Sequence, residues 1–317
     1  MIGKNDKGRD IAILKIVKRR RFASTQQIWD LLPTDVRGTD YNTFQDRLLK
    51  FARFHYIRRV GKMWPGVMAK YEITDKGNAC LEERAEKEFY SDTVTPTNKR
   101  LPRKEFAHTK MIVDVLASIE KGVNADPNVK FISWEEILQR APEKTRTLDN
   151  PHLFPKVHIS LQHTTGKMKG KTEHMDISLL PDAFFGLEYQ TPEGKQYRFF
   201  ALETEHKDNL TRSTLKKNSF LRKALAYRAL MSRRNSEPKY RLHLGIPNMY
   251  VIFAAPTLGR AKRMQEIAGE SAYFLYAAMP VENYDYLTEP PSMPDFYNDP
   301  YQRSGKPSFF INKPDKQ

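Results

Sequence analysis

The stretch Tyr71-Glu72-Ile73-Thr74-Asp75-Lys76-Gly77 decides how the first quarter of the chain is interpreted. It passes from an extended segment, Met68 to Ile73, into a helix that continues to about Tyr90. Another extended segment, Tyr56 to Val60, lies just upstream, and the turn-rich tip Gly61 to Gly66 joins the two. We therefore expect a strand, a tip and a returning strand, followed by a helix.

Three helices are expected upstream of this hairpin. From Arg9 to Arg20 the apolar residues recur at the spacing of one helical face. Two further helices are expected from Gln26 to Leu32 and from Tyr41 to Phe54, each preceded by short polar residues of the kind that cap helices. These capping candidates are Ser24 or Thr25 for the second helix, and Thr39 or Asp40 for the third.

This order of elements resembles the winged helix-turn-helix superfamily, in which a Tyr-x-Leu-Thr-x-x-Gly phrase is common at the position of Tyr71 to Gly77. The resemblance implies that the third helix enters the major groove of DNA, with Gln45 reading adenine and Arg47 reading guanine or holding a phosphate. Winged domains also serve as protein-interaction modules, and this alternative stays open. The expected DNA contacts lie on the basic run, the third helix and the tip, and they are Arg19, Arg20, Arg21, Gln45, Arg47, Lys50, Lys62 and Trp64.

The charge of the chain favours a polyanionic partner. Lys and Arg number 53 against 38 Asp and Glu, a formal net charge of +15, which indicates double-stranded DNA as the partner. A basic surface that serves solubility is the alternative. The single cysteine, Cys80, excludes an internal disulfide and a cysteine-based zinc site. No stretch approaches the roughly 18 apolar residues of a membrane span, and no signal peptide is visible, so we expect a cytoplasmic protein without a membrane partner.

A length of 317 residues suggests two domains. Residues 1–90 are expected to form the winged helix, and residues 91–103, which are polar, basic and interrupted by two prolines, to form a linker. Residues 104–281 are expected to form an α/β domain, and residues 282–317 an irregular C-terminal tail.

The expected elements of the second domain alternate between strands and helices, which predicts an α/β fold with a mixed sheet. A helix from Phe106 to Lys121 begins the domain. The segments that follow are strands at Val129 to Ser133, Lys156 to Leu161, Met175 to Leu180, Ala183 to Tyr189 and Tyr197 to Glu205, a long helix at Thr214 to Met231, a strand at Asn248 to Ala255, a helix at Gly259 to Ala268 and a last strand at Ala272 to Ala278.

Pro181-Asp182 and Glu205-His206-Lys207 together resemble the Pro-Asp … (Asp/Glu)-x-Lys pattern of restriction-endonuclease-like nucleases. The resemblance implies Mg²⁺ held by Asp182 and Glu205, with Lys207 steadying the attacking hydroxide and Glu136 as an accessory acid. Glu203, Glu205 and Lys207 alternate along one expected strand and so point to the same face. The alternative is that Glu203 and Glu205 balance Arg and Lys neighbours at the end of a sheet. The resemblance also leaves open an inactive domain, because many members of this fold have lost activity.

A second resemblance extends over most of the chain. Its elements are the winged helix, a helix that starts at Phe106-Ala107-His108, the Leu180-Pro181-Asp182 stretch, the acidic pair Glu203-x-Glu205 and the basic helix with Tyr227. Together they are similar to the replication-relaxation family, which typically carries Glu-x-Asp where this chain has two glutamates. The resemblance implies a DNA-binding protein of a plasmid, phage or integrative element. A second copy of the chain and other replication or transfer proteins are further partners that it leaves open.

A zinc site is an alternative chemistry that the spacing does not favour. Four histidines and an aspartate lie within a short stretch, but they lack the tight ligand spacing of zinc motifs. These residues are His152, His158, His163, His174 and Asp176.

Overall fold

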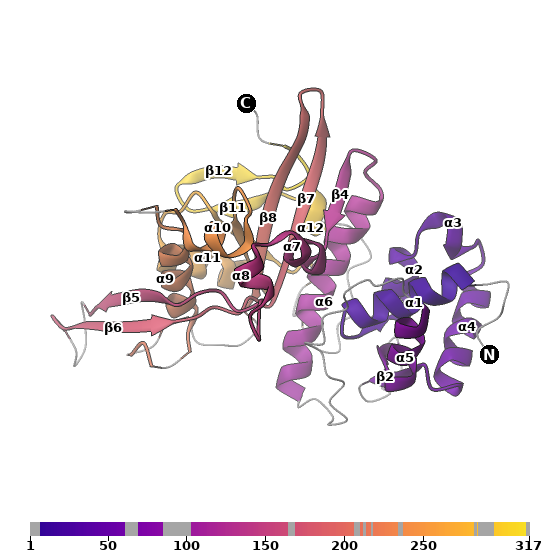
Figure 1. Cartoon of the computed structure of the whole chain (residues 1–317). Helices are drawn as coiled ribbons and strands as arrows, with labels where there is room; N and C mark the ends of the chain where they lie inside the picture. The colour runs from indigo at the N-terminus through magenta and orange to yellow at the C-terminus, as the bar shows by residue number, and fades with distance from the viewer. Residues whose placement is uncertain are drawn as a thin grey trace. The chain divides into compact units, whose positions relative to one another are not determined.

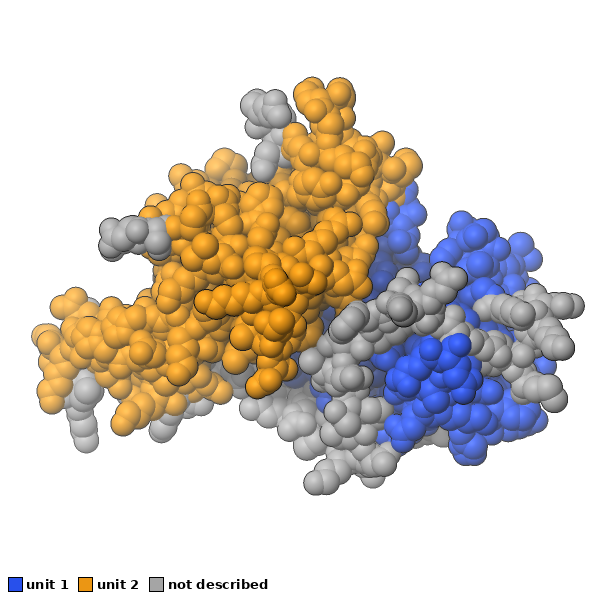
Figure 2. All heavy atoms as spheres, in the orientation of Figure 1, with its two compact units in different colours: residues 1–125, 285–297 blue, residues 126–284, 298–317 orange. Residues whose placement is uncertain are grey.

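The computed structural model describes residues 7–60, 69–84, 103–163, 169–205, 210–211, 214–216, 218–233, 237–281, 284 and 295–314. The chain divides into two compact units, residues 1–125 with 285–297, and residues 126–284 with 298–317 (Figure 2). None of the described helices is both long and apolar enough to cross a membrane.

The N-terminal unit has the element order of a winged helix (Figure 1). Strand β3 lies between β1 and β2 in a three-stranded antiparallel sheet. In chain order the elements are α1 (Lys7–Arg19), β1 (Ala23–Ser24), α2 (Thr25–Leu31), α3 (Thr34–Arg37), α4 (Tyr41–Arg53), β2 (Ile57–Val60), β3 (Lys70–Ile73) and α5 (Asp75–Arg84). The expected tip Gly61 to Gly66 lies outside the described residues.

The glycine at the end of the Tyr71–Gly77 motif is required for steric reasons. The backbone N–H of Gly77 donates to Thr74 Oγ1, and the backbone N–H of Thr74 donates to the carbonyl of Tyr56. A Cβ at position 77 would lie 2.2 Å from that same carbonyl oxygen, so the first turn of α5 can approach the end of α4 and the start of β2 only with glycine.

Helix α6 (Arg103–Asn124) belongs to this N-terminal unit, which differs from the expected boundary at residue 104. The rings of Phe22 and Phe106 stack with centroids 5.0 Å apart. Gln27 of α2 donates to Asp114 at 2.8 Å, and Asp114 also pairs with Lys110, whose side chain is fully buried. The helix is thus attached to the winged helix by buried polar contacts as well as by ring packing, and periodicity alone does not show this attachment.

The second unit contains a seven-stranded mixed sheet in the order β12-β11-β10-β9-β8-β7-β4. Strands β8 and β9 are parallel, as are β9 and β10, whereas the remaining neighbours are antiparallel. The strands are β4 (Val129–Ile132), β7 (Ala183–Thr191), β8 (Gly194–Thr204), β9 (Tyr250–Ala255), β10 (Phe274–Ala278), β11 (Tyr301–Arg303) and β12 (Lys306–Phe309).

Helices cover one face of this sheet around an apolar core that includes Ala201, Phe253 and Tyr227. Helices α9 and α11 contact each other there, and α11 also lies against β9 and β10. The helices of the unit are α7 (Trp134–Arg140), α8 (Glu143–Arg146), α9 (Phe220–Met231), α10 (Lys239–Leu244) and α11 (Leu258–Ala268).

Two expected elements of this unit depart furthest from their expected bounds. Helix α9 begins at Phe220 because Ser219 caps it by accepting from the backbone N–H of Arg222, so the helix is shorter than the segment Thr214 to Met231. The strand expected at Met175 to Leu180 is β6 (Thr172–Ile177), which pairs with β5 (Val157–Gln162) in a separate two-stranded sheet.

The C-terminal region is more regular than the expected tail. Strands β11 and β12 extend the large sheet beyond β10, and Tyr189 Oη donates to the carbonyl of Ile311. The short helix α12 (Asp295–Asn298) precedes them, with Phe296 and Tyr297 buried. Three-residue and four-residue strands with polar side chains carry almost no periodic signal, which explains why the sequence pattern misses them.

Candidate functional site

Helix α4 is built to present one polar face. Asp40 caps it by accepting from the backbone N–H groups of Asn42 and Thr43 at 3.1 and 3.0 Å. Phe44, Leu48 and Phe51 are buried in the core of the winged helix. The opposite face is exposed and is polar except for Leu49; its residues are Asn42, Thr43, Gln45, Asp46, Leu49, Lys50 and Arg53.

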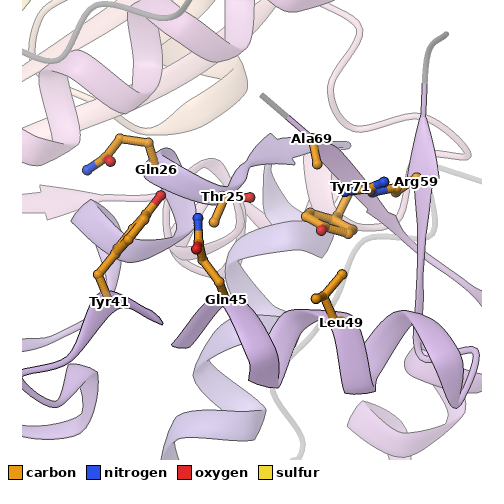
Figure 3. A pocket seen from close by; sticks show the side chains of 8 residues that line it. All are labelled: Thr25, Gln26, Tyr41, Gln45, Leu49, Arg59, Ala69 and Tyr71. Atoms are coloured by element: carbon orange, nitrogen blue, oxygen red, sulfur yellow. The ribbon is translucent and has the colours of Figure 1, made fainter. Parts of the chain in front are cut away.

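A pocket adjoins this face of α4 (Figure 3). Tyr41, Gln45 and Leu49, one helical turn apart, form one wall, and the start of α2 and the strands β2 and β3 supply the rest. Burial raises the pKa of Tyr41, while a hydrogen bond with Gln45 acts in the opposite direction. The remaining lining residues are Thr25, Gln26, Arg59, Ala69 and Tyr71.

Arg47 lies on α4 but is turned towards the interior. Its guanidinium makes a two-point contact with the carboxylate of Asp10 in α1, including an Nε–Oδ1 hydrogen bond of 2.9 Å. The Asp10 side chain is fully buried, and that of Arg47 is about one fifth exposed. A guanidinium held in this way supports the packing of α1 on α4. This contact with Asp10 is not among the roles expected for Arg47, which are reading guanine or holding a phosphate.

The basic run after α1 is also largely engaged. Arg19 and Arg20 both pair with the carboxylate of Glu120 in α6, and the side chain of Arg20 is almost completely buried. Arg21 has a left-handed backbone conformation, with φ of 64°. Two of the three arginines of the basic run that are expected to contact DNA therefore pair with a carboxylate of α6. Lys62 and Trp64 lie outside the described residues.

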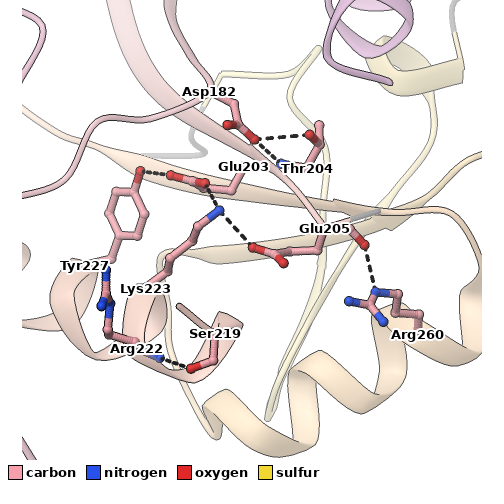
Figure 4. Close-up of polar contacts among 9 residues, drawn as sticks. All are labelled: Asp182, Glu203, Thr204, Glu205, Ser219, Arg222, Lys223, Tyr227 and Arg260. Carbon is pink, nitrogen blue, oxygen red and sulfur yellow. Dashed lines mark hydrogen bonds and ion pairs between the residues drawn. The ribbon is translucent and has the colours of Figure 1, made fainter. Parts of the chain in front are cut away.

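In the second unit, three carboxylates converge at the end of β8 (Figure 4). Asp182, which directly precedes β7, accepts from the backbone N–H of Thr204 at 2.7 Å and from its hydroxyl at 3.1 Å. Glu203 and Glu205 are each 1% exposed. Both contact the same lysine of α9, which shows that they lie on one side of the chain as their spacing predicts.

That lysine is Lys223, whose ammonium group lies between the two glutamates. Its Nζ is 2.7 Å from Oε2 of Glu203 and 3.0 Å from Oε1 of Glu205. Tyr227, one turn further along α9 and fully buried, donates its hydroxyl to Oε1 of Glu203 at 2.7 Å. The two side chains share one helical face, so α9 supplies both a cation and a hydrogen-bond donor to the cluster.

Burial and the neighbouring charges together set the pKa values in this cluster. Burial raises the pKa of Glu203 to about 7, although the charge of Lys223 and the hydrogen bonds from Lys223 and Tyr227 oppose the rise. Burial also acts to lower the pKa of Lys223, but the carboxylates of Glu203, Asp182 and Glu205 outweigh it and raise that pKa well above its ordinary value. Lys223 therefore stays charged at neutral pH, whereas Glu203 is partly protonated.

The arrangement does not fit a resident Mg²⁺ ion. Mg²⁺ requires near-octahedral oxygen ligands at about 2.0–2.1 Å, and the space between Glu203 and Glu205 is taken by the Lys223 ammonium. Within the described residues, no three His, Cys, Asp or Glu side chains form a group that could hold a metal ion. The three expected ligands Asp182, Glu205 and Glu136 are thus not gathered into such a group.

Two expected members of the site lie elsewhere or are not described. Glu136 closes a capping box at the start of α7, where it accepts from the backbone N–H of Ser133 at 2.8 Å, and it pairs with Lys130 at 3.3 Å. Lys207 lies outside the described residues, beyond the end of β8 at Thr204.

Sequence reasoning missed Lys223, although a signal was present. Phe220, Ala224, Tyr227 and Leu230 form the buried stripe of α9, and helical spacing places residue 223 within that stripe. A lysine on an otherwise buried face requires an anionic partner, and this requirement points to a neighbouring acidic pair.

Comparison with curated proteins finds no match, and comparison with solved structures finds none either. One family model, described as replication-relaxation, matches residues 14–245. The match covers well over half of the chain and includes both the exposed face of α4 and the carboxylate cluster with its lysine. The chain therefore belongs to the replication-relaxation family.

Proposed function

We propose that the chain is a DNA-binding protein of a mobile element, such as a plasmid, a phage or an integrative element. In this proposal the winged helix places the second unit on double-stranded DNA for replication, transfer or transcription control. The observation that carries the proposal is the exposed polar face of α4, since a capped helix with such a face over an apolar core suits the major groove.

The chemistry of that face supports both reading and positioning. The exposed amide of Gln45 suits the N6 and N7 edge of adenine, and Lys50 and Arg53 suit phosphates on either side of the groove. Arg59, exposed on β2 beside the pocket, adds a further cation. Family membership supports an activity on DNA, because the family is described by replication and relaxation.

The test is duplex binding by the full chain, measured by fluorescence anisotropy over a range of salt concentrations. The variant Lys50→Ala/Arg53→Ala is expected to bind about tenfold more weakly and to lower the slope of log K against log salt by about 2. Lys262→Ala, at an exposed position of α11, is the matched control. Unchanged affinity and slope in the double variant would remove α4 as the DNA contact.

A Mg²⁺-dependent DNA endonuclease that uses Asp182, Glu205 and Lys207 is a second candidate. The convergence of Asp182, Glu203 and Glu205 favours it, because phosphodiester-cleaving sites gather carboxylates. The position of the Lys223 ammonium weighs against it.

Incubation of supercoiled plasmid with the chain and Mg²⁺ or Mn²⁺ decides between the two candidates. Cutting that is lost in Asp182→Ala and Glu205→Ala establishes the nuclease. The nuclease is excluded if both variants still cut the plasmid, or if the parent chain cuts no plasmid with either metal. The DNA-binding role then remains.

A further inference from the structure

The strands β5 and β6 form a ribbon that is separate from the large sheet of the second unit. They pair antiparallel in continuous register, from Val157 opposite Ile177 to Gln162 opposite Thr172. In Figure 1 the ribbon extends outward past α9, with its loop end furthest from the sheet. Neighbouring strands are about 4.8 Å apart, so an isolated pair of strands with its side chains is a narrow element.

The inner face of the ribbon fixes it to the unit. Val157 and Ile159 are buried in the main core, and Leu161, Met175 and Ile177 pack against it. Glu173 accepts from Thr214 Oγ1 at 2.5 Å and from the backbone N–H of Leu215 at 2.9 Å, and it contacts His163 at 3.1 Å. These contacts hold the ribbon in one orientation, so that its other face is presented as a fixed surface.

The outer face is entirely polar. It consists of three cross-strand pairs, His158 with Asp176, Ser160 with His174 and Gln162 with Thr172, all of them exposed. His158 Nδ1 lies 2.9 Å from Asp176 Oδ1, and its Nε2 lies 3.3 Å from His174 Nδ1. The imidazoles are therefore oriented by each other and by the carboxylate, and the face offers both donors and acceptors.

The loop end of the ribbon is basic. Lys169 and Lys171 are exposed just before β6, and the sequence contains no acidic residue from Lys156 to Lys171. An outer face without apolar or aromatic anchors lacks the residues that dominate protein–protein interfaces. Alternating donors and acceptors that end in lysines match base edges flanked by phosphates instead.

We propose that the β5–β6 ribbon is a second DNA-contacting element, which lays its outer face in a groove of duplex DNA while Lys169 and Lys171 bind phosphates. The major groove, about 12 Å wide, admits a two-stranded ribbon. Ser160, Gln162, Thr172 and the imidazoles face base edges, and Asp176 is an acceptor for a cytosine amino group. The inference rests on the proposed DNA binding but assigns a contact in the other unit.

Two measurements on the full chain test the ribbon. In the first, Lys169→Ala/Lys171→Ala is titrated with a random-sequence duplex, and the salt slope is expected to fall by about 2 because two phosphate contacts are lost. In the second, Gln162→Ala/His174→Ala is used to select binders from a random duplex pool. That variant is expected to lose about tenfold of the parent's discrimination at some base positions, while its salt slope stays unchanged.

The controls separate this inference from the winged-helix proposal. Lys262→Ala should leave both readouts unchanged. If Lys50→Ala/Arg53→Ala weakens binding and neither ribbon variant differs from the parent, the ribbon inference is overturned and the α4 face stands. If only the ribbon variants change the salt slope or the base discrimination, the ribbon inference stands and the α4 assignment fails. A parent chain that binds no duplex overturns both.

Discussion

The exposed face of α4 and the carboxylate cluster at the end of β8 use charged side chains in opposite ways. On α4, Lys50 and Arg53 extend into solvent over an apolar core. At the end of β8, Glu203 and Glu205 are 1% exposed and share the ammonium of Lys223. The first surface is available to an external anion, whereas the charge of the second is partly neutralised by its own lysine.

The difference shows that residue type alone does not determine whether a charged side chain stabilises the fold or is available to an external partner. Arg47 and Lys50 are three residues apart on α4, yet Arg47 pairs with the buried Asp10 and Lys50 is exposed. Removing one member of a buried ion pair leaves the other charge unpaired in the protein interior, which lowers stability strongly. Removing an exposed charged side chain changes the stability of the folded chain little. Stability measurements therefore separate the two classes before any DNA is added.

Arg47→Ala is expected to give the largest effect. It leaves the fully buried carboxylate of Asp10 without its guanidinium, and the free energy of unfolding should fall by about 4 kcal/mol in urea titration. Lys50→Ala, on the same helix, should change it by less than about 0.5 kcal/mol. Equal small effects in both variants would mean that Arg47 belongs with the exposed face after all.

Lys223→Met should come next, with a loss of about 3 kcal/mol, because two buried glutamates then lack the ammonium between them. The same variant sharpens the comparison when thermal unfolding is followed with added Mg²⁺ or Ca²⁺. We expect millimolar divalent cation to raise the Tm of the variant and to leave that of the parent unchanged. If the divalent cation raises the Tm of the parent as well, the cluster binds the cation in the parent and the Lys223 ammonium moves out from between the glutamates.

Local patterns predicted most of the elements. Ser24 and Asp40, each one of two expected candidates, cap α2 and α4, and the apolar stripe of α4 is Phe44, Leu48 and Phe51. Strand β3 is followed by α5, whose first turn contains Gly77. The alternation of Glu203 and Glu205 also placed both carboxylates on one side. Each of these features depends on neighbours within a few residues, where sequence spacing determines geometry.

The features that sequence reasoning missed depend on partners far apart along the chain. Glu120, which engages Arg19 and Arg20, is about 100 residues away from them, and Asp10 is 37 residues from Arg47. Spacing within one helix cannot show that a cation is used by a distant carboxylate. For the same reason the attachment of α6 to the winged helix and the pairing of β11 with β10 escape a local pattern.

The cluster should make the stability of the chain depend on pH. The pKa of Glu203 is about 7 in the folded chain, above its ordinary value of 4.5, so the folded state holds the proton more tightly than the unfolded state. Its contribution to stability is present below about pH 4.5 and is lost as the pH rises towards 7. Between pH 5 and pH 8 the free energy of unfolding should fall by roughly 2 kcal/mol from this group. Glu203→Gln should flatten that part of the profile, and an unchanged profile would assign the dependence to other groups.

Tyr227→Phe gives the smallest effect and the finest test of the cluster. It removes one buried hydrogen bond to Glu203 and should lower the free energy of unfolding by about 1 kcal/mol. That hydrogen bond also favours the ionised carboxylate, so its loss should move the stability midpoint attributed to Glu203 to higher pH. Tyr276→Phe is the control, since Tyr276 is a fully buried tyrosine of the same core that makes no hydrogen bond to the cluster in the described residues. A stability loss without a shift of the midpoint would show that the hydroxyl of Tyr227 stabilises the protonated and the ionised form of Glu203 equally, and the stabilisation of the ionised form would then rest on Lys223.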